Sequence, residues 1–246
     1  MAKPFQYDFW GRIYPERTYV TISPSLEFRA KILEKNIEIT LRISINVAQI
    51  TVSILSESEI KDIFTVKNIV EDFLYSIINS FGYSQGSAFT IEITGVINQQ
   101  SGKTIIFSVS IPVLIEQVKN LENQFSDVIN HLLITNDWRL RLCLADLCSS
   151  IKFSKDSAFL VYRGIESIQS YFADKHSIEK KQAWEKFREE LQIEYSELMF
   201  VKDFADPIRH GGLKPISDQD RGKVLMIGWA IVDKYISYRR QEVTFS

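Results

Sequence analysis

The chain has 246 residues, of which 45% are hydrophobic and 24% are charged. This composition is typical of a globular protein and excludes a disordered or fibrous chain. Its 29 basic and 31 acidic residues give a net charge of −2, which excludes the strongly basic surface of a dedicated duplex-DNA-binding protein. Two cysteines, Cys143 and Cys148, are too few for a disulfide framework, and the three histidines have no metal-ligand spacing. We therefore expect neither a metal nor a cofactor.

The sequence carries no signal for export or for membrane insertion. Residues 1–12 contain charged residues and lack the apolar core of a signal peptide. The longest apolar run, residues 224–232, has nine residues, less than half of the roughly 20 that cross a bilayer. We expect a cytoplasmic protein with no membrane contact, in which both cysteines are free thiols.

The first predicted domain, residues 1–112, combines strands with one helix. Apolar residues alternate with polar ones, or cluster among β-branched residues, in segments 19–22, 37–43, 89–93 and 103–110. Residues 98–102 are typical of a hairpin connection, which predicts antiparallel pairing. One helix is expected over residues 69–81, with Thr65 as its N-cap and Gly82 as its stop. The prediction is an α+β module of mostly antiparallel strands with one packed helix.

An aromatic cluster precedes this pattern and has two interpretations. It contains Phe5, Tyr7, Phe9, Trp10 and Tyr14. Such residues can stack on a nucleic-acid base, or they can form an arm that packs across the sheet. We favour the arm.

The second predicted domain, residues 113–246, is an all-α bundle of five to six helices. The strand pattern ends at Pro112, and apolar residues then recur every three or four positions. Helical patterns cover residues 138–147, 159–172, 184–191, 198–205 and 224–235. The residues expected to begin these helices are, in order, Asn136 or Asp137, Ser154 or Asp156, Ser177, Ser196 and Ser217. Arg239 and Arg240 are expected to end the last helix, where cations complement its dipole.

The segment 202–212 contains the groups best suited to chemistry. Pro207 cannot continue a helix cleanly and disfavours helical geometry at Asp206, so we predict a helix break there. Asp206 then suits the N-cap of a short turn, and Gly211 suits a left-handed stop. The turn holds Arg209 and His210 near a carboxylate, and these groups can transfer protons or bind a phosphate.

A structural role accounts for the same residues. Arg209 can neutralise Asp206 or Glu166, and His210 can donate a hydrogen bond to a carbonyl group at the helix break. Arg163 and Glu166 lie three residues apart, so they can form an ion pair or support Arg209. Both interpretations stay open at this point.

Residues 113–240 resemble the HEPN superfamily (higher eukaryotes and prokaryotes nucleotide-binding). The residues that carry the resemblance are Tyr162-Arg163-Gly164-Ile165-Glu166 and Ile208-Arg209-His210-Gly211. Many members are helical bundles that cleave RNA without a metal, often in prokaryotic defence or toxin systems, through an arginine and a histidine several residues apart. The resemblance implies that His210 and Arg209 are catalytic, and we place Asp206, Lys202, Arg163 and Glu166 in support. In this chain Arg209 directly precedes His210.

Three functions fit these observations. The first is an RNA-directed protein, either a metal-independent ribonuclease or a protein that binds RNA or a nucleotide, and its bundle can form a homodimer. The second is a non-catalytic interaction or oligomerisation module whose strand-rich half binds a protein partner. The third is a sensor of a small phosphorylated ligand, held at Arg209 and His210.

Overall fold

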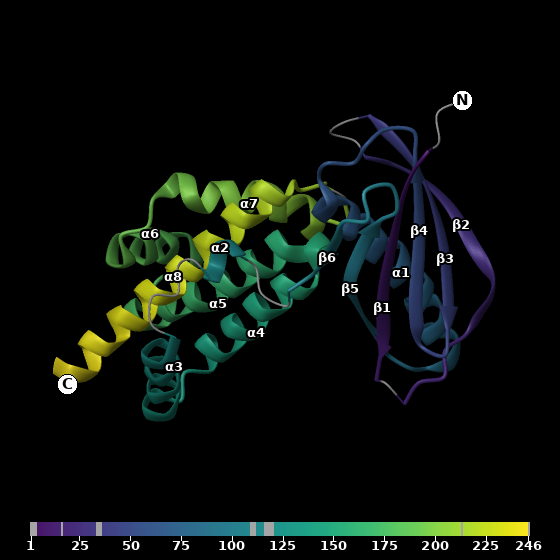
Figure 1. Cartoon of the computed structure of the whole chain (residues 1–246). Coiled ribbons are helices and arrows are strands. Elements are labelled where there is room, and N and C mark those ends of the chain that lie inside the picture. Colours follow the sequence, from purple (N-terminus) through teal and green to yellow (C-terminus); the bar gives the residue numbers. More distant parts are fainter. Residues whose placement is uncertain are drawn as a thin grey trace. The chain divides into compact units, whose positions relative to one another are not determined.

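A computed structural model of the chain describes residues 4–15, 17–32, 36–108, 112–115, 121–212 and 214–245. The chain divides into two compact units, residues 1–109 and residues 110–246. The first unit contains strands and one long helix, and the second is helical (Figure 1).

The first unit is an antiparallel sheet with a helix on one face. Its described residues form six strands in the order β2-β3-β4-β1-β5-β6. Every neighbouring pair in this order is antiparallel. The strands are β1 (Phe5–Tyr14), β2 (Ile22–Ile32), β3 (Ile37–Asn46), β4 (Gln49–Ser56), β5 (Thr90–Asn98) and β6 (Thr104–Ile106). The helix is α1 (Ile63–Gln85), which lies against the sheet (Figure 1). The predicted α+β architecture of this half is confirmed.

Side-chain periodicity explains this packing. In β1, Tyr7 and Phe9 are two residues apart and both are buried, because alternate residues of a strand face the same side. In α1, Val66, Val70 and Leu74 are four residues apart and meet that side of the sheet. The helix and the strands therefore share one apolar core.

Three predictions in this unit were wrong. The aromatic cluster at the N-terminus is not an arm: it belongs to β1, a central strand that pairs with both β4 and β5. The N-cap of α1 is Asp62 rather than Thr65, and its carboxylate accepts hydrogen bonds from the Thr65 amide at 3.1 Å and hydroxyl at 2.7 Å. The helix also continues past Gly82 and ends at Gly86, whose φ of 61° suits a left-handed C-cap.

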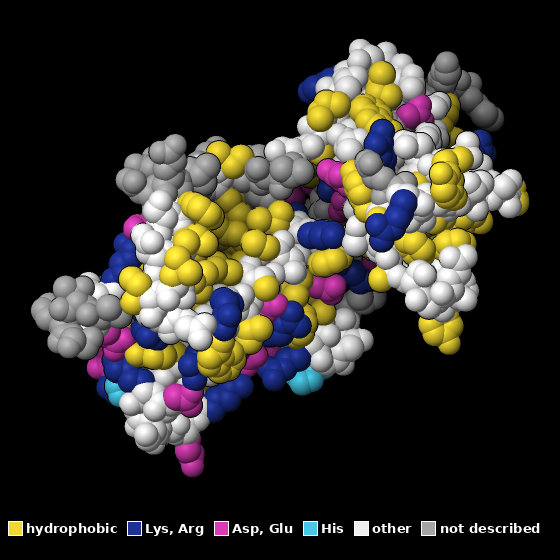
Figure 2. Space-filling view, turned by 90° about the horizontal axis from the view of Figure 1, so that it is seen from below, with side chains coloured by type: hydrophobic (Ala, Val, Ile, Leu, Met, Phe, Trp, Pro, Cys, Tyr) yellow, Lys and Arg dark blue, Asp and Glu magenta, His cyan; other side chains and the backbone are white. Residues whose placement is uncertain are grey.

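The second unit is a helical bundle, and side chains of both charge signs lie on the face that Figure 2 shows. Six helices longer than ten residues lie in its described part, within the predicted five to six. The helices are α2 (Pro112–Ile115), α3 (Leu121–Thr135), α4 (Trp138–Lys152), α5 (Ser157–His176), α6 (Lys180–Leu191), α7 (Tyr195–Arg209) and α8 (Asp218–Phe245), with a 3₁₀ turn at Ser154–Asp156. None of the helices in the described ranges is long and apolar enough to cross a membrane.

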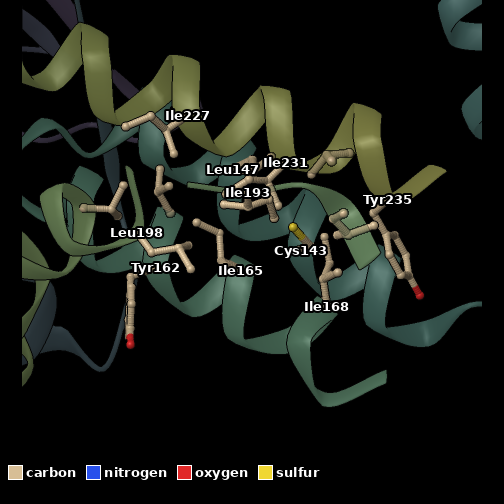
Figure 3. Packing of buried hydrophobic residues seen from close by; sticks show 14 of the residues in the cluster. Cys143, Leu147, Tyr162, Ile165, Ile168, Ile193, Leu198, Ile227, Ile231 and Tyr235 are labelled. Carbon is tan, nitrogen blue, oxygen red and sulfur yellow. The ribbon is translucent and has the colours of Figure 1, made fainter. Parts of the chain in front are cut away.

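Helix α5 lies at the centre of the bundle core. Its Ile165 belongs to one buried cluster with Leu147 of α4 and Ile231 of α8 (Figure 3). Gly228 allows α8 to approach closely, because a Cβ atom there would lie 2.8 Å from the Val161 Cγ1 atom of α5. The three helices are thus packed without room for an added methyl group at this point.

Three of the predicted helix starts are confirmed. Asp156 takes the N-cap position of α5, without a hydrogen bond from its side chain to the helix. The Asp137 carboxylate accepts hydrogen bonds from the backbone amides of Arg139 and Leu140 and caps α4. The Ser217 hydroxyl accepts a hydrogen bond of 3.0 Å from the Asp220 amide at the start of α8.

Other predicted boundaries were wrong. Ser177 does not begin a helix but ends α5 in the left-handed conformation, and α6 starts at Lys180. Helix α7 begins after Glu194 rather than Ser196, because Glu194 and Glu197 form a capping box. Helix α8 does not end at Arg239 and Arg240 but continues to Phe245.

Candidate functional site

Helix α7 runs through Pro207, so the predicted break at Asp206 is wrong. Proline has no N–H group and cannot bond to the carbonyl four residues earlier, which belongs to Asp203. The Lys214 ammonium donates a hydrogen bond of 2.8 Å to that carbonyl oxygen instead. The freed acceptor is satisfied, and the helix continues for another two residues.

The end of α7 is a Schellman motif. The Gly212 amide donates to the carbonyl of Pro207 at 2.8 Å, and the Gly211 amide donates to the carbonyl of Ile208 at 3.1 Å. Gly211 has a φ of 78°, as expected for a left-handed stop. Asp206 is therefore not an N-cap, and His210 takes the C-cap position.

Arg209 and His210 occupy the last turn and the cap of α7, and both are exposed. The C-terminal end of a helix carries partial negative charge, which stabilises cationic side chains there. Among the described residues, no side chain hydrogen-bonds to the His210 imidazole. The structure thus presents the two side chains at the surface, with the arginine as part of a larger group of charges.

Arg209 shares a carboxylate with a second cation. The Oε1 atom of Glu166 lies 3.6 Å from Arg209 Nη1 and 3.0 Å from Lys180 Nζ. The Glu166 side chain is mostly buried, whereas almost half of the Arg209 side chain is exposed. The ion pair with Glu166 that a structural role requires is therefore present, but it leaves much of the guanidinium accessible.

Asp206 and Lys202 complete the group. Their charged atoms lie 3.8 Å apart, one turn apart on α7. Burial and the nearby carboxylates of Glu166 and Asp206 raise the pKa of Tyr162 to about 12, which the charge of Arg209 opposes. We call the residues Glu166, Lys180, Lys202, Asp206, Arg209 and His210 the α7-end cluster.

Arg163 points to a different partner. Its Nε atom donates a hydrogen bond of 2.9 Å to Asp146 of α4, and its Nη2 atom pairs with the same carboxylate. This bidentate pair holds Arg163 against α4 rather than beside Glu166. Of the six residues predicted from the sequence, the structure thus joins Glu166 with Arg209 and Asp206 with Lys202, and it leaves Arg163 with Asp146.

A second polar network, centred on Asp137, was missed by the sequence analysis. The carboxylate of Asp137 is buried and accepts a hydrogen bond of 2.6 Å from the Tyr235 hydroxyl. Arg239 Nη1 lies 3.4 Å from it, and His131 Nε2 lies 3.7 Å from it. Burial alone would raise the pKa of Asp137, but His131, Tyr235, the Leu140 amide and Arg239 hold it well below its usual range.

The Asp137 network extends to the surface through Arg239. The guanidinium of Arg239 lies 4.1 Å from the centre of the Tyr171 ring, and its Nε atom lies 3.2 Å from Glu242. Tyr171 donates a hydrogen bond of 2.7 Å to the same glutamate. Because the charged groups of this network pair with one another inside the bundle, we assign the network to stability rather than to ligand binding.

The described ranges contain no group of three or more histidine, cysteine, aspartate or glutamate side chains that could hold a metal ion.

Comparison with protein families gives two matches. Residues 7–107 match the N-terminal domain of DUF8168, a domain of unknown function, and residues 125–240 match its C-terminal domain. The chain carries both domains of DUF8168 in order. The first match lies within the sheet unit and the second within the helical unit. Neither a curated protein nor a solved structure matches the chain.

Proposed function

We propose that this DUF8168 chain is an RNA-directed protein that binds the phosphate backbone at the α7-end cluster. The observation that supports this most strongly is an excess of positive charge. In the ion pairs of the described residues, Lys180 and Arg209 share the carboxylate of Glu166, and Lys202 pairs with Asp206. Three cations thus face two carboxylates in these pairs, and His210 adjoins Arg209. A phosphate would add the negative charge that this cluster lacks.

Arg209 is the group best placed to contact a phosphate. Its distance of 3.6 Å to Glu166 is longer than a hydrogen bond, so the ion pair does not use its donors in full. A guanidinium has five N–H donors in a planar fork that fits two phosphate oxygens. The exposed side chain can therefore bind a phosphate with little change in its surroundings.

The geometry supports binding better than cleavage. A histidine that acts as a general base is normally held in position by a third group. Within the described residues no such group bonds to the His210 imidazole, whereas a phosphate contact needs only charge and an available donor. The resemblance to HEPN proteins points to RNA as the phosphate-bearing ligand.

The test is fluorescence anisotropy of a labelled single-stranded RNA titrated with the full chain. We expect Arg209→Ala to weaken binding roughly tenfold, as for the loss of a charge-assisted hydrogen bond. The slope of log affinity against log salt should fall by about one.

Arg42→Ala is the matched control, because Arg42 is also exposed and pairs with a single carboxylate, Glu27, at 3.1 Å. This control should bind RNA like the unchanged protein. Absence of RNA binding, or an equal loss in Arg42→Ala, would refute the proposal. The RNA should also stay intact in the presence of EDTA. If the unchanged protein cleaves the RNA and the His210→Ala variant does not, His210 has a catalytic role instead.

A further inference from the structure

Pro207 leaves one carbonyl group of α7 without its usual donor. In an α-helix each amide bonds to the carbonyl four residues earlier, so the amide at position 207 would bond to the Asp203 carbonyl. Proline has no N–H group, and its ring crowds that carbonyl. The missing bond lies at the base of the turn that presents Arg209 and His210. The last turn of α7 is therefore joined to the rest of the helix by one bond fewer than in an unbroken helix.

Lys214 replaces this bond from the chain that follows α7. Its ammonium donates a hydrogen bond of 2.8 Å to the Asp203 carbonyl oxygen. The same ammonium lies 4.4 Å from the centre of the Phe204 ring, and Phe204 packs against the bundle core. Water can also satisfy an exposed carbonyl, but it does not link the helix to the chain that follows. We call these two contacts the Lys214 tether.

The turn held by the tether carries the residues proposed to bind phosphate. Helix ends fray, because their last residues have fewer hydrogen bonds. Fraying of this turn would move Arg209 away from the Glu166 carboxylate on α5, from which it lies 3.6 Å. A binding site needs its donors in place before the ligand arrives, since ordering them on binding costs free energy. The tether supplies this order.

We propose that Lys214 is a positioning residue of the α7-end cluster. This inference rests on the proposed function: Arg209 contacts the phosphate, and Lys214 holds the turn on which Arg209 lies. The Lys214 ammonium is already engaged by a carbonyl and a ring of α7. Pro207 and Lys214 act as a pair, because the proline removes a bond within the helix and the lysine replaces it from outside.

A second substitution that restores the first tests this pairing. Lys214→Met removes the ammonium and keeps an apolar stem for the contact with Phe204. Pro207→Ala supplies an N–H group that can bond to the Asp203 carbonyl within the helix. If Lys214 acts through the helix, the double variant no longer needs the tether and should behave like the unchanged chain.

RNA binding is the first measurement, by anisotropy of the same labelled single-stranded RNA. We expect Lys214→Met to weaken binding roughly fivefold, as for the loss of one hydrogen bond. The double variant should bind like the unchanged chain, with the same dependence on salt. A lysine that contacts phosphate directly would not be rescued, and its loss would lower the salt slope by about one. A double variant that binds as weakly as Lys214→Met, or a Lys214→Met variant that binds like the unchanged chain, would overturn the proposal.

Hydrogen exchange of backbone amides tests the tether without RNA. The amides of His210, Gly211 and Gly212 donate hydrogen bonds within the end of α7. In Lys214→Met these amides should exchange roughly fivefold faster, and in the double variant at the rate of the unchanged chain. Equal rates in Lys214→Met and the unchanged chain would overturn the proposal. If these rates follow the prediction but the unchanged chain does not bind RNA, the proposed function fails and the role of Lys214 in holding the end of α7 is supported.

Lys223→Met is the matched control. The Lys223 ammonium also lies over a phenylalanine ring of α7, 4.0 Å from the centre of Phe200. In the part of the chain that the structure describes, it donates no hydrogen bond. Lys214 and Lys223 are both exposed, so both variants should keep the fold. Lys223→Met removes the same charge and leaves the Asp203 carbonyl satisfied, so amide exchange and RNA binding should match the unchanged chain. An effect as large as that of Lys214→Met would assign the loss to charge alone and overturn the proposal.

Discussion

Replacement of Asp137 by alanine should destabilise the helical unit more than any surface substitution. The Asp137 carboxylate caps α4 through the amides of Arg139 and Leu140. It also accepts the hydrogen bond of Tyr235 and faces the guanidinium of Arg239 in a buried position. Asp137→Ala removes all of these interactions and leaves their donors without an acceptor.

The loss in the free energy of unfolding can be worked out from the groups that Asp137→Ala leaves without a partner. Loss of a helix N-cap costs about 1 kcal/mol. A buried hydroxyl left without its acceptor costs about 1–3 kcal/mol, and breaking a buried ion pair costs about 3–5 kcal/mol. These contributions overlap because they share one carboxylate, so we expect a loss of about 3–5 kcal/mol in the free energy of unfolding.

Urea unfolding followed by far-UV circular dichroism measures this loss in the helix-rich unit. Asp127→Ala is the matched control, because Asp127 is a half-exposed aspartate whose ion pair is with Arg240 at 2.8 Å. A surface ion pair contributes at most about 1 kcal/mol, so the control should remain close to the unchanged protein. Equal stabilities of Asp137→Ala and Asp127→Ala would show that the Asp137 network does not stabilise the fold as argued.

Two further predictions concern pH and packing. The pKa of Asp137 is lowered in the folded state, so its contribution to the free energy of unfolding is present above the unfolded pKa of about 3.9 and is lost as the pH falls below that value. Asp137→Asn should therefore flatten the acid limb of a plot of stability against pH. An unchanged acid limb would contradict this. Gly228→Val should cost about 1–3 kcal/mol or more, because its Cβ atom would lie 2.8 Å from Val161. Gly222→Ala is the packing control, since among the described residues the one neighbour of its Cβ atom is Val113 at 3.6 Å. Equal melting temperatures for the two variants would refute the packing argument.

Periodicity predicted the two halves of the fold because apolar residues recur every second position in the strands and every third or fourth position in the helices. Alternation of period two marks the strands, and the spacing of Val70, Leu74 and Ile78 marks α1. The same alternation is present in Tyr7 and Phe9 of β1, so the central strand was detectable and was misread as an arm. Its pairing with β4 and β5 depends on segments far along the chain, which local patterns do not show.

The candidate site was predicted in its residues but not in its geometry. The rule for proline predicted a break at Pro207, and the contact from Lys214 to the carbonyl of Asp203 overrides it. The Asp137 network could not be predicted, because Tyr235 and Arg239 lie about 100 residues from Asp137. Local sequence identified Asp137 only as a helix cap, since its other partners come from folding of the whole bundle.

The most direct test of the central claim is to locate the contact between RNA and protein. A single-stranded RNA that contains 4-thiouridine would be cross-linked by light to the full chain, and the modified peptide would be identified by mass spectrometry. We predict that the cross-links fall in residues 202–212, at the end of α7. Cross-links confined to residues 7–107, with the α7 segment unmodified, would contradict the account.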